Sequence, residues 1–411
     1  MSDILLSPSA LGLAAAGVAL GVYKYRQYMD GCRIRIVTSE AKASAVIVRR
    51  TGDKDKEETT SLRDILYNEC PLLTDPEQAV MVPTPYLATG LLQTIFATMR
   101  IRRRDSSSDV AYTRELLTMD DGATVSLDWC AAECAENAPI VLVMSGVGGS
   151  SQEHHVRALA KTLTRADDPK ALGARVVVVN HRGTAGTPIT APRPYDVGFT
   201  GDLRAAVAHI RQTNPGAPIV GVGFSMGANI MTKYAGEEAA ACPLACVVAV
   251  CCPFDITVSG PAMDESNLLN NHVFQPAVMG TLMRALRRAD HLDLNAEWDL
   301  DLPKIRAARR LSQLEDELLV KVNGYRDRAE YYARSSSARV VDRVAVPLLA
   351  INSLDDRITP PQGIPVAKIA ANPHTALALV PHGGHLGFLT GVPPTIWFVK
   401  PIEEFLAAIL G

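Results

Sequence analysis

Short runs of β-branched and other apolar residues recur along the last two thirds of the chain, and stretches with helical periodicity separate them. The apolar runs lie at 139–144, 175–180, 218–224, 245–252, 347–352 and 376–380. The helical stretches lie near 153–164, 202–213, 226–238, 361–371 and 395–409. Most runs are continuous rather than alternating, which is typical of parallel strands covered on both faces. The pattern therefore predicts an α/β fold with a mostly parallel central sheet flanked by helices.

Two segments depart from this rhythm. The pair 111–118 and 123–129, separated by Asp121-Gly122, predicts an antiparallel hairpin before the parallel strands. The interval 256–340 is far longer than one crossover requires and carries amphipathic helical patterns near 274–288 and 302–320. We interpret this interval as an inserted helical cap.

The N-terminal segment carries no charged residue from position 4 to position 23. Twenty helical residues rise about 30 Å, the thickness of a bilayer core. Only Asp3 precedes the segment, whereas Lys24 and Arg26 follow it, so the leading positive charge of a cleaved signal peptide is missing. We expect an uncleaved single-pass anchor in the endoplasmic reticulum or another intracellular membrane, in preference to a signal peptide or a buried soluble helix. The positive-inside rule would leave the body in the cytosol.

These patterns divide the chain into an expected order of parts. The parts are a membrane anchor (1–28), an extension and linker packing on the core (29–110), the first part of the core (111–255), the helical cap (256–340) and the second part of the core (341–411).

Composition narrows the classes of protein that fit these 411 residues. A hydrophobic fraction of 47% and a formal net charge of −3 exclude wholesale disorder and argue against nucleic acid as the main partner. The eight cysteines include no C-x-x-C pair, and no group of His and Cys residues has the spacing of a zinc site. We therefore expect free and mostly buried thiols, no metal and no cofactor.

The strongest chemical signal is the G-x-S-x-G motif at 223–227 (GFSMG). It follows an apolar run and precedes a helical stretch, which is the strand–turn–helix setting of a nucleophile elbow. We expect Ser225 at the sharp turn. Side chains two positions away on either side would collide with the neighbouring strand or helix, which explains the two glycines. The other interpretation is a structural glycine-rich turn.

A serine hydroxyl is not ionised near neutral pH, so Ser225 needs a general base. The loop after the last predicted strand carries His382 and His385. We favour His385 because glycines on both sides of it allow the loop to turn the imidazole back toward Ser225. His382 is the rival in the same loop.

The base needs a carboxylate on its far nitrogen, which fixes the tautomer and stabilises the imidazolium. Asp355 and Asp356 follow the apolar run 347–352, and Asp255 follows the run 245–252. The chain order serine, aspartate, histidine is that of an α/β-hydrolase. In that fold the acid commonly lies four residues before a proline, which selects Asp356. Asp355 is then expected to cap or brace the loop, although it and Asp255 stay open as the acid.

Acyl transfer also needs backbone donors aimed at the developing oxyanion. One is the N–H of Met226, directly after Ser225. The second is expected from the glycine-rich loop 145–151, where we favour Val147. A phosphate-binding loop is the alternative, although the segment lacks both G-x-G-x-x-G and a following Lys-Ser/Thr.

The motifs and their order along the chain resemble the AB-hydrolase type 4 branch of the α/β-hydrolase superfamily. This branch includes membrane-anchored α/β-hydrolase domain-containing lipases and yeast medium-chain ethyl ester synthase/esterases. The matching stretches are 86–94 (YLATGLLQT), 127–129 (LDW), 180–183 (NHRG), 191–195 (APRPY), 223–229 (GFSMGAN), 252–255 (CPFD) and 382–388 (HGGHLGF). Ser145 departs from the pattern, since relatives often carry His or Pro there. The resemblance implies triad roles for Ser225, Asp356 and His385 and supports the membrane segment. Some members place their body on the lumenal side, so the orientation stays open.

These features predict a membrane-anchored serine hydrolase that cleaves esters of medium- or long-chain acyl groups. Lipids such as monoacylglycerols, phospholipids or fatty acid ethyl esters are the expected substrates. One alternative is an acyltransferase or ethyl ester synthase, in which an alcohol captures the same acyl-enzyme. Another is a non-catalytic membrane scaffold on a hydrolase fold. The oligomeric state does not follow from the sequence.

Overall fold

The computed structural model describes residues 24, 26–40, 47–50, 57–102, 110–130, 134–135, 137–165, 172–194, 196–268, 270–288 and 298–411. The uncharged segment 4–23, which carries the anchor prediction, lies outside the described residues. Within the described ranges, no helix has both the length and the apolar character needed to cross a bilayer.

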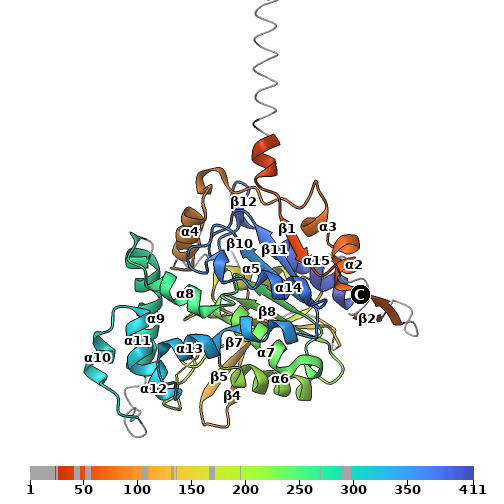
Figure 1. The fold of residues 1–411 in the computed structure, drawn as a ribbon. Coiled ribbons are helices and arrows are strands. Elements are labelled where there is room, and N and C mark those ends of the chain that lie inside the picture. Colours follow the sequence, from red (N-terminus) through yellow and green to blue (C-terminus); the bar gives the residue numbers. More distant parts are fainter. Residues whose placement is uncertain are drawn as a thin grey trace, which may run out of the picture.

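A nine-stranded sheet of described residues forms the centre of the molecule, in the order β1-β11-β10-β9-β8-β6-β7-β5-β4 (Figure 1). Its strands are β1 (Arg35–Thr38), β4 (Tyr112–Thr118), β5 (Thr124–Cys130), β6 (Ile140–Met144), β7 (Arg175–Asn180), β8 (Ile219–Phe224), β9 (Val247–Val250), β10 (Leu348–Ser353) and β11 (Thr375–Val380). The strands from β6 to β11 pair in parallel. At the two edges, β1, β5 and β4 pair antiparallel. The predicted parallel sheet and the predicted hairpin are therefore confirmed.

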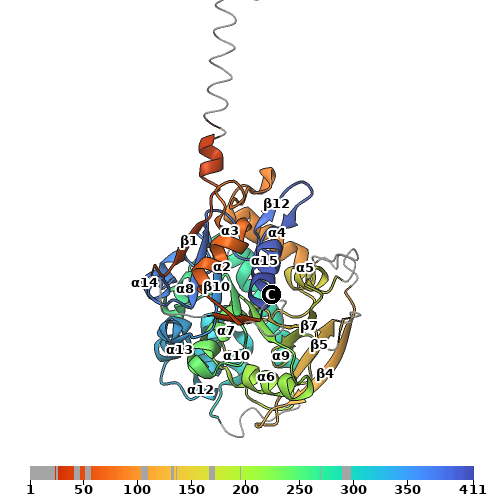
Figure 2. The same ribbon diagram turned by 90° about the vertical axis from the view of Figure 1, so that its right-hand side faces the viewer.

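Helices cover both faces of this sheet (Figure 1 and Figure 2). They include α2 (Leu62–Glu69), α3 (Pro71–Thr74), α4 (Gly90–Arg102), α5 (His154–Leu163), α6 (Gly201–Thr213), α7 (Met226–Glu238), α14 (Val366–Ala371) and α15 (Val399–Leu410). Side chains alternate along a strand, so Val141 and Val143 pack with α2, α5 and α15, whereas Leu142 and Met144 pack with α6 and α7. Both faces of the strand are buried, which explains the continuous apolar runs.

The interval 256–340 is helical in its described part. It contains α8 (Ile256–Asp264), the π-helix η3 (Asn270–Phe274), α9 (Gln275–Arg288), α10 (Leu302–Ala307), α11 (Leu311–Leu314), the π-helix η4 (Glu315–Leu319), α12 (Val320–Val322) and α13 (Arg328–Ser335). The pattern near 274–288 corresponds to one helix, but the pattern near 302–320 is broken. The Gln313 side chain accepts hydrogen bonds from the backbone N–H groups of Arg309 and Arg310, which starts a new helix there.

The N-terminal part of the described chain adds to the sheet. Strand β1 pairs antiparallel with β11, with Arg35 opposite Leu379. Two small hairpins lie outside the central sheet: β2 (Ile47–Arg50) pairs with β3 (Glu57–Thr60), and β12 (Leu389–Thr390) pairs with β13 (Thr395–Ile396). The candidate site lies beyond the ends of β8, β10 and β11, because Ser225, Asp356 and His385 follow these strands in sequence.

Candidate active site

Ser225 lies between the end of β8 and the start of α7. Its φ of 53° falls in the left-handed region, which residues other than glycine rarely adopt. A Cβ on Gly223 would lie 2.5 Å from Cα of Ala228, and one on Gly227 would lie 2.4 Å from the carbonyl oxygen of Met144. Only glycine fits at either position, because the turn brings strand and helix backbones together. The geometry is that of the elbow that the sequence predicts.

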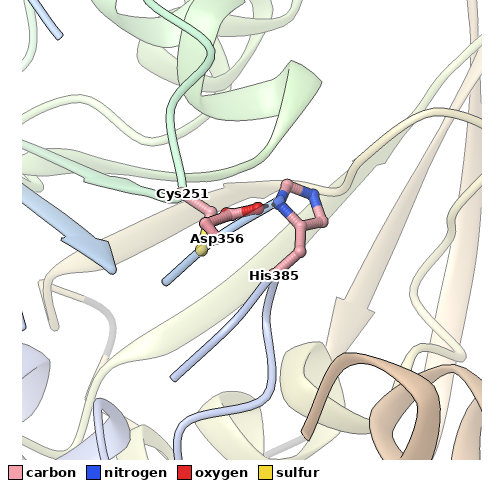
Figure 3. A group of neighbouring side chains, drawn as sticks. All are labelled: Cys251, Asp356 and His385. Atoms are coloured by element: carbon pink, nitrogen blue, oxygen red, sulfur yellow. Dashed lines mark hydrogen bonds and ion pairs between the residues drawn. The ribbon is translucent and has the colours of Figure 1, made fainter. Parts of the chain in front are cut away.

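The structure brings Ser225, His385 and Asp356 into one hydrogen-bonded chain. Nε2 of His385 lies 2.9 Å from Oγ of Ser225, and Nδ1 of His385 lies 2.8 Å from Oδ2 of Asp356. Asp356 is 3% exposed and His385 is 9% exposed, so little water competes for these contacts. In Figure 3 the carboxylate of Asp356 points toward the imidazole of His385. This arrangement can move a proton from a serine hydroxyl to a histidine held by a carboxylate.

The surroundings of Asp356 keep its carboxylate ionised. Burial raises the pKa of Asp356, but the positive charge that His385 can carry and hydrogen bonds from His385 and Thr359 outweigh it, so the pKa lies below 3.8. The backbone N–H groups of Ile358 and Thr359 donate to Oδ1 over 2.8 and 2.9 Å, and the Thr359 hydroxyl donates to Oδ2 over 2.7 Å. An ionised Asp356 orients the Nδ1–H of His385 and stabilises its imidazolium form.

Cys251 also lies beside this pair (Figure 3). Single ligand atoms of Cys251, Asp356 and His385 lie within 4.8 Å of one another. Burial, followed by the charge of Asp356, raises the pKa of the Cys251 thiol well above 9.0, whereas a metal would bind the thiolate. Its Sγ instead accepts the backbone N–H of Leu386 over 3.4 Å. The donor set fits a protonated thiol packed against the loop 382–388, which we call the histidine loop, rather than a metal centre.

The other candidate acids and the rival base have different contacts. Asp355 accepts the backbone N–H of Gly90 over 2.7 Å and that of Gly384 over 2.9 Å, so it ties the start of α4 to the histidine loop. Nδ1 of His382 lies 3.7 Å from Oδ2 of Asp355. Asp255 caps α8 by accepting the backbone N–H of Thr257.

The loop 145–151 lies directly against the serine. A Cβ on Gly146 would lie 3.2 Å from Cβ of Ser225. Among the described residues, no acceptor takes the backbone N–H of Val147 or that of Met226. The assignment of these two N–H groups to the oxyanion stays a prediction.

A family model described as alpha/beta hydrolase fold matches residues 139–392, which include the serine, the histidine and the acid. The chain belongs to the α/β-hydrolase family. It is 33% identical over 316 residues to the embryogenesis-associated protein EMB8 of Picea glauca, covering 75% of this chain and 67% of that protein. It is 28% identical to phospholipase ABHD3 of Mus musculus (85% and 82% covered) and 31% identical to a monoacylglycerol lipase of Saccharomyces cerevisiae (65% and 59% covered). Among solved structures, an esterase from Pyrococcus furiosus matches with a TM-score of 0.47 and 16% identity over 74% of this chain and 94% of that one.

A buried polar network holds both ends of the loop 145–151, the predicted oxyanion loop, in this α/β-hydrolase. At one end, the amide of Asn180 accepts the backbone N–H of Ser151 over 2.9 Å, and Asp128 accepts the Ser151 hydroxyl over 2.5 Å. At the other end, His181 donates from Nε2 to the carbonyl oxygen of Ser145 over 3.1 Å. Burial lowers the pKa of His181, which favours its neutral form.

Sequence reasoning did not assign a role to these network residues. Asp128 and Asn180 belong to stretches that carried the family resemblance, and both lie in buried strands of the central sheet. A polar residue that is almost fully buried in a strand needs partners, and this is the signal that could have revealed the network. Arg114 completes it with two hydrogen bonds to Asp128, of 2.7 and 2.8 Å.

A cavity of about 660 Å³ opens beside Ser225 and His385. Its apolar wall comes from the interval 256–340, through Met263, Phe274, Val278 and Leu311. Its more polar wall comes from α4 and the start of α5, and includes Glu153. Burial raises the pKa of Glu153 to about 7. The volume lies within the range of sites that enclose a small organic molecule or an acyl chain.

Proposed function

We propose that this chain is a serine carboxylic-ester hydrolase of the lipase or esterase type that acts on medium- or long-chain acyl esters. The observation that carries this proposal is the hydrogen-bonded chain Ser225–His385–Asp356 facing a cavity with an apolar wall. The relatives named as phospholipase and monoacylglycerol lipase support an ester of a lipid as the substrate.

The proposed reaction has two halves. Oγ of Ser225 attacks the ester carbonyl carbon while its proton passes to Nε2 of His385. The tetrahedral oxyanion then accepts hydrogen bonds from the N–H groups of Val147 and Met226. The carbon–oxygen bond to the alcohol breaks, and His385 protonates the leaving oxygen. Water, deprotonated by His385, attacks the acyl-enzyme in the same way and releases the fatty acid and Ser225.

In this proposal the interval 256–340 acts as a cap that encloses the acyl chain. Its residues Met263, Phe274 and Leu311 line the cavity and offer an aliphatic chain an apolar surface. Each CH₂ group removed from water there contributes about 0.8 kcal/mol, which favours longer chains until the cavity is filled. Turnover of p-nitrophenyl esters should therefore rise from acetate to medium chain lengths.

We also propose that residues 1–28 anchor the protein in a membrane, because the segment 4–23 contains no charge. The full-length protein should stay with the membrane fraction after an alkaline carbonate wash. Release into the supernatant would contradict the anchor without bearing on the esterase activity.

Labelling with a fluorophosphonate probe tests the proposed function directly. The wild-type protein should be labelled and Ser225→Ala should not, because the probe reacts only with an activated serine. Ser145→Ala, with a hydroxyl removed from the neighbouring oxyanion loop, is the control and should keep its labelling. A folded wild-type protein without labelling would overturn the hydrolase proposal and favour the scaffold.

A further inference from the structure

Helix α4 buries two polar side chains and exposes two large apolar ones. Gln93 is fully buried and its amide oxygen accepts the backbone N–H of Leu389. Thr94 is 5% exposed and its hydroxyl accepts the backbone N–H of His385 over 2.8 Å. In contrast, Leu92 is 44% exposed and Met99 is 59% exposed. A helix on the water-facing surface of a globular protein normally has the opposite arrangement.

The exposed Leu92 and Met99 share one face of α4 with the half-buried Ile95. Leu92, Ile95 and Met99 are spaced by three and four residues, so they lie above one another along the helix. Tyr86 lies just before α4 and is 56% exposed, and Val392 in the β12–β13 turn is 72% exposed. Thr84 places this turn beside the start of α4, through hydrogen bonds to the carbonyl oxygens of Leu389 and Gly391. We call Tyr86, Leu92, Ile95, Met99 and Val392 the α4 face.

The position of the α4 face indicates what covers it. Both views place α4 and β12 at the end of the molecule from which the helical residues 26–30 project (Figure 1 and Figure 2). The uncharged segment 4–23 directly precedes those residues in the sequence. Residues 90–102 contain two arginines and no acidic residue, and two more arginines follow at 103 and 104. A helix that exposes large apolar side chains and whose sequence carries basic but no acidic residues matches the interface of a bilayer that contains anionic lipid.

The other side of α4 belongs to the cavity. Thr94, Ala97 and Thr98 line it together with Ser225 and His385. If the outer side of α4 meets lipid, the helix lies on the path by which an ester passes from the lipid into the cavity.

We propose that the α4 face docks on the surface of a lipid bilayer and presents the cavity to esters that reside in that bilayer. The inference rests on the proposed function, and it adds the surface through which the enzyme meets its substrate. Docking buries the exposed side chains of α4 in lipid, which removes their contact with water.

The test uses the full-length protein in vesicles of phosphatidylcholine and phosphatidylserine. The double variant Leu92→Gln/Met99→Gln removes the apolar contact, and glutamine has a helix propensity close to that of leucine and methionine. Hydrolysis of a long-chain monoacylglycerol in the vesicles should fall about tenfold, because partial burial of two large apolar side chains is lost. Hydrolysis of dissolved p-nitrophenyl butyrate should not change. The control Leu116→Gln removes an equally exposed leucine from β4 and should leave both rates unchanged.

A second measurement reads contact with lipid without using activity. The indole introduced by Leu92→Trp should be quenched by brominated lipids, and the indole introduced by Leu116→Trp should not. Equal quenching at the two positions, or an unchanged vesicle rate in the double variant, would overturn the docking proposal. Loss of self-association in the double variant with an unchanged vesicle rate would show that a second copy covers the face instead. Absence of turnover of both esters by the wild-type protein would contradict the proposed function rather than the docking face.

Discussion

The two loops that flank Ser225 are held by different parts of the molecule. The oxyanion loop 145–151 is held by Asp128, Asn180 and His181, all from strands of the central sheet or the residue after one. The histidine loop 382–388 is held by α4, which precedes the core in sequence, and by Asp355. The loop 145–151 is therefore held by the sheet alone, whereas the loop 382–388 is held both by Asp355, which follows β10, and by a helix outside the sheet.

This difference has a physical consequence. The side chains that hold the loop 145–151 lie in central strands or directly after one, and such strands open only with the core of the protein. Helix α4 is half-exposed. Among the described residues, none covers its exposed apolar side chains Leu92 and Met99. We expect changes in α4 to affect the base selectively, and changes in the sheet network to affect the oxyanion donors.

The largest effect is expected from Asp356→Asn. The change removes the charge that stabilises the imidazolium and favours the wrong tautomer of His385, so kcat should fall about 10⁴-fold. Asp355→Asn is the matched neighbour, because it weakens the brace between Gly90 and Gly384 but leaves the contact to His385 intact. Its fall in kcat should be far smaller. The measurement is kcat for ester hydrolysis by the two variants. A similar fall in kcat in both would contradict the assignment of Asp356 as the acid.

A smaller effect is expected from Asp128→Asn in the sheet network. The variant weakens the hold on Ser151 and the ion pair with Arg114, so the oxyanion loop loses its placement. We expect kcat to fall about a hundredfold with little change in KM, because the lost contact acts on the transition state. A rise in KM with an unchanged kcat would place Asp128 in substrate binding instead. Thermal unfolding of the same sample controls for general loss of structure.

The corresponding change on the histidine side is Thr94→Val. It removes the acceptor for the backbone N–H of His385, and the loss of one buried hydrogen bond predicts a fall in kcat/KM of about fivefold to tenfold. Thr98→Val is the control, since Thr98 lies one turn further along α4, lines the same cavity and does not contact His385. Thr94→Ser keeps the acceptor and should restore the rate. Equal losses in the two valine variants would point to the cavity wall rather than to the loop.

The smallest effect concerns Glu153 in the cavity wall, near the oxyanion loop. Burial raises its pKa from 4.5 to about 7, so the folded state resists ionisation of this group. As the pH rises from 4.5 to 7, the unfolded chain loses this proton before the folded chain does, and the stability of the fold falls. Glu153→Gln should therefore raise the unfolding temperature more at pH 8 than at pH 5. An equal change at both pH values, measured by calorimetry, would contradict the raised pKa.

Local patterns in the sequence predict much of the fold. The continuous apolar runs identify the parallel strands, and the sequence Gly-Phe-Ser-Met-Gly identifies the turn at Ser225, because strand burial and turn sterics act over a few neighbouring residues. Strand β1 was not predicted. It is only four residues long and becomes a strand by pairing with β11 at the far end of the chain.

For the candidate site too, the sequence determined one part and the tertiary structure decided the other. The sequence by itself determined that a serine, a histidine and an adjacent pair of aspartates follow strands at one edge of a parallel sheet. The sequence favoured Asp356 but left Asp355 open, and the tertiary structure decided that Asp356 faces His385, since the two neighbouring side chains take different directions. It also decided that Thr94 bonds to His385 and that Gly90 bonds to Asp355, across separations of 291 and 265 residues. A hydrogen bond between residues so far apart leaves no periodic pattern in the sequence, because its geometry exists only after the sheet has formed.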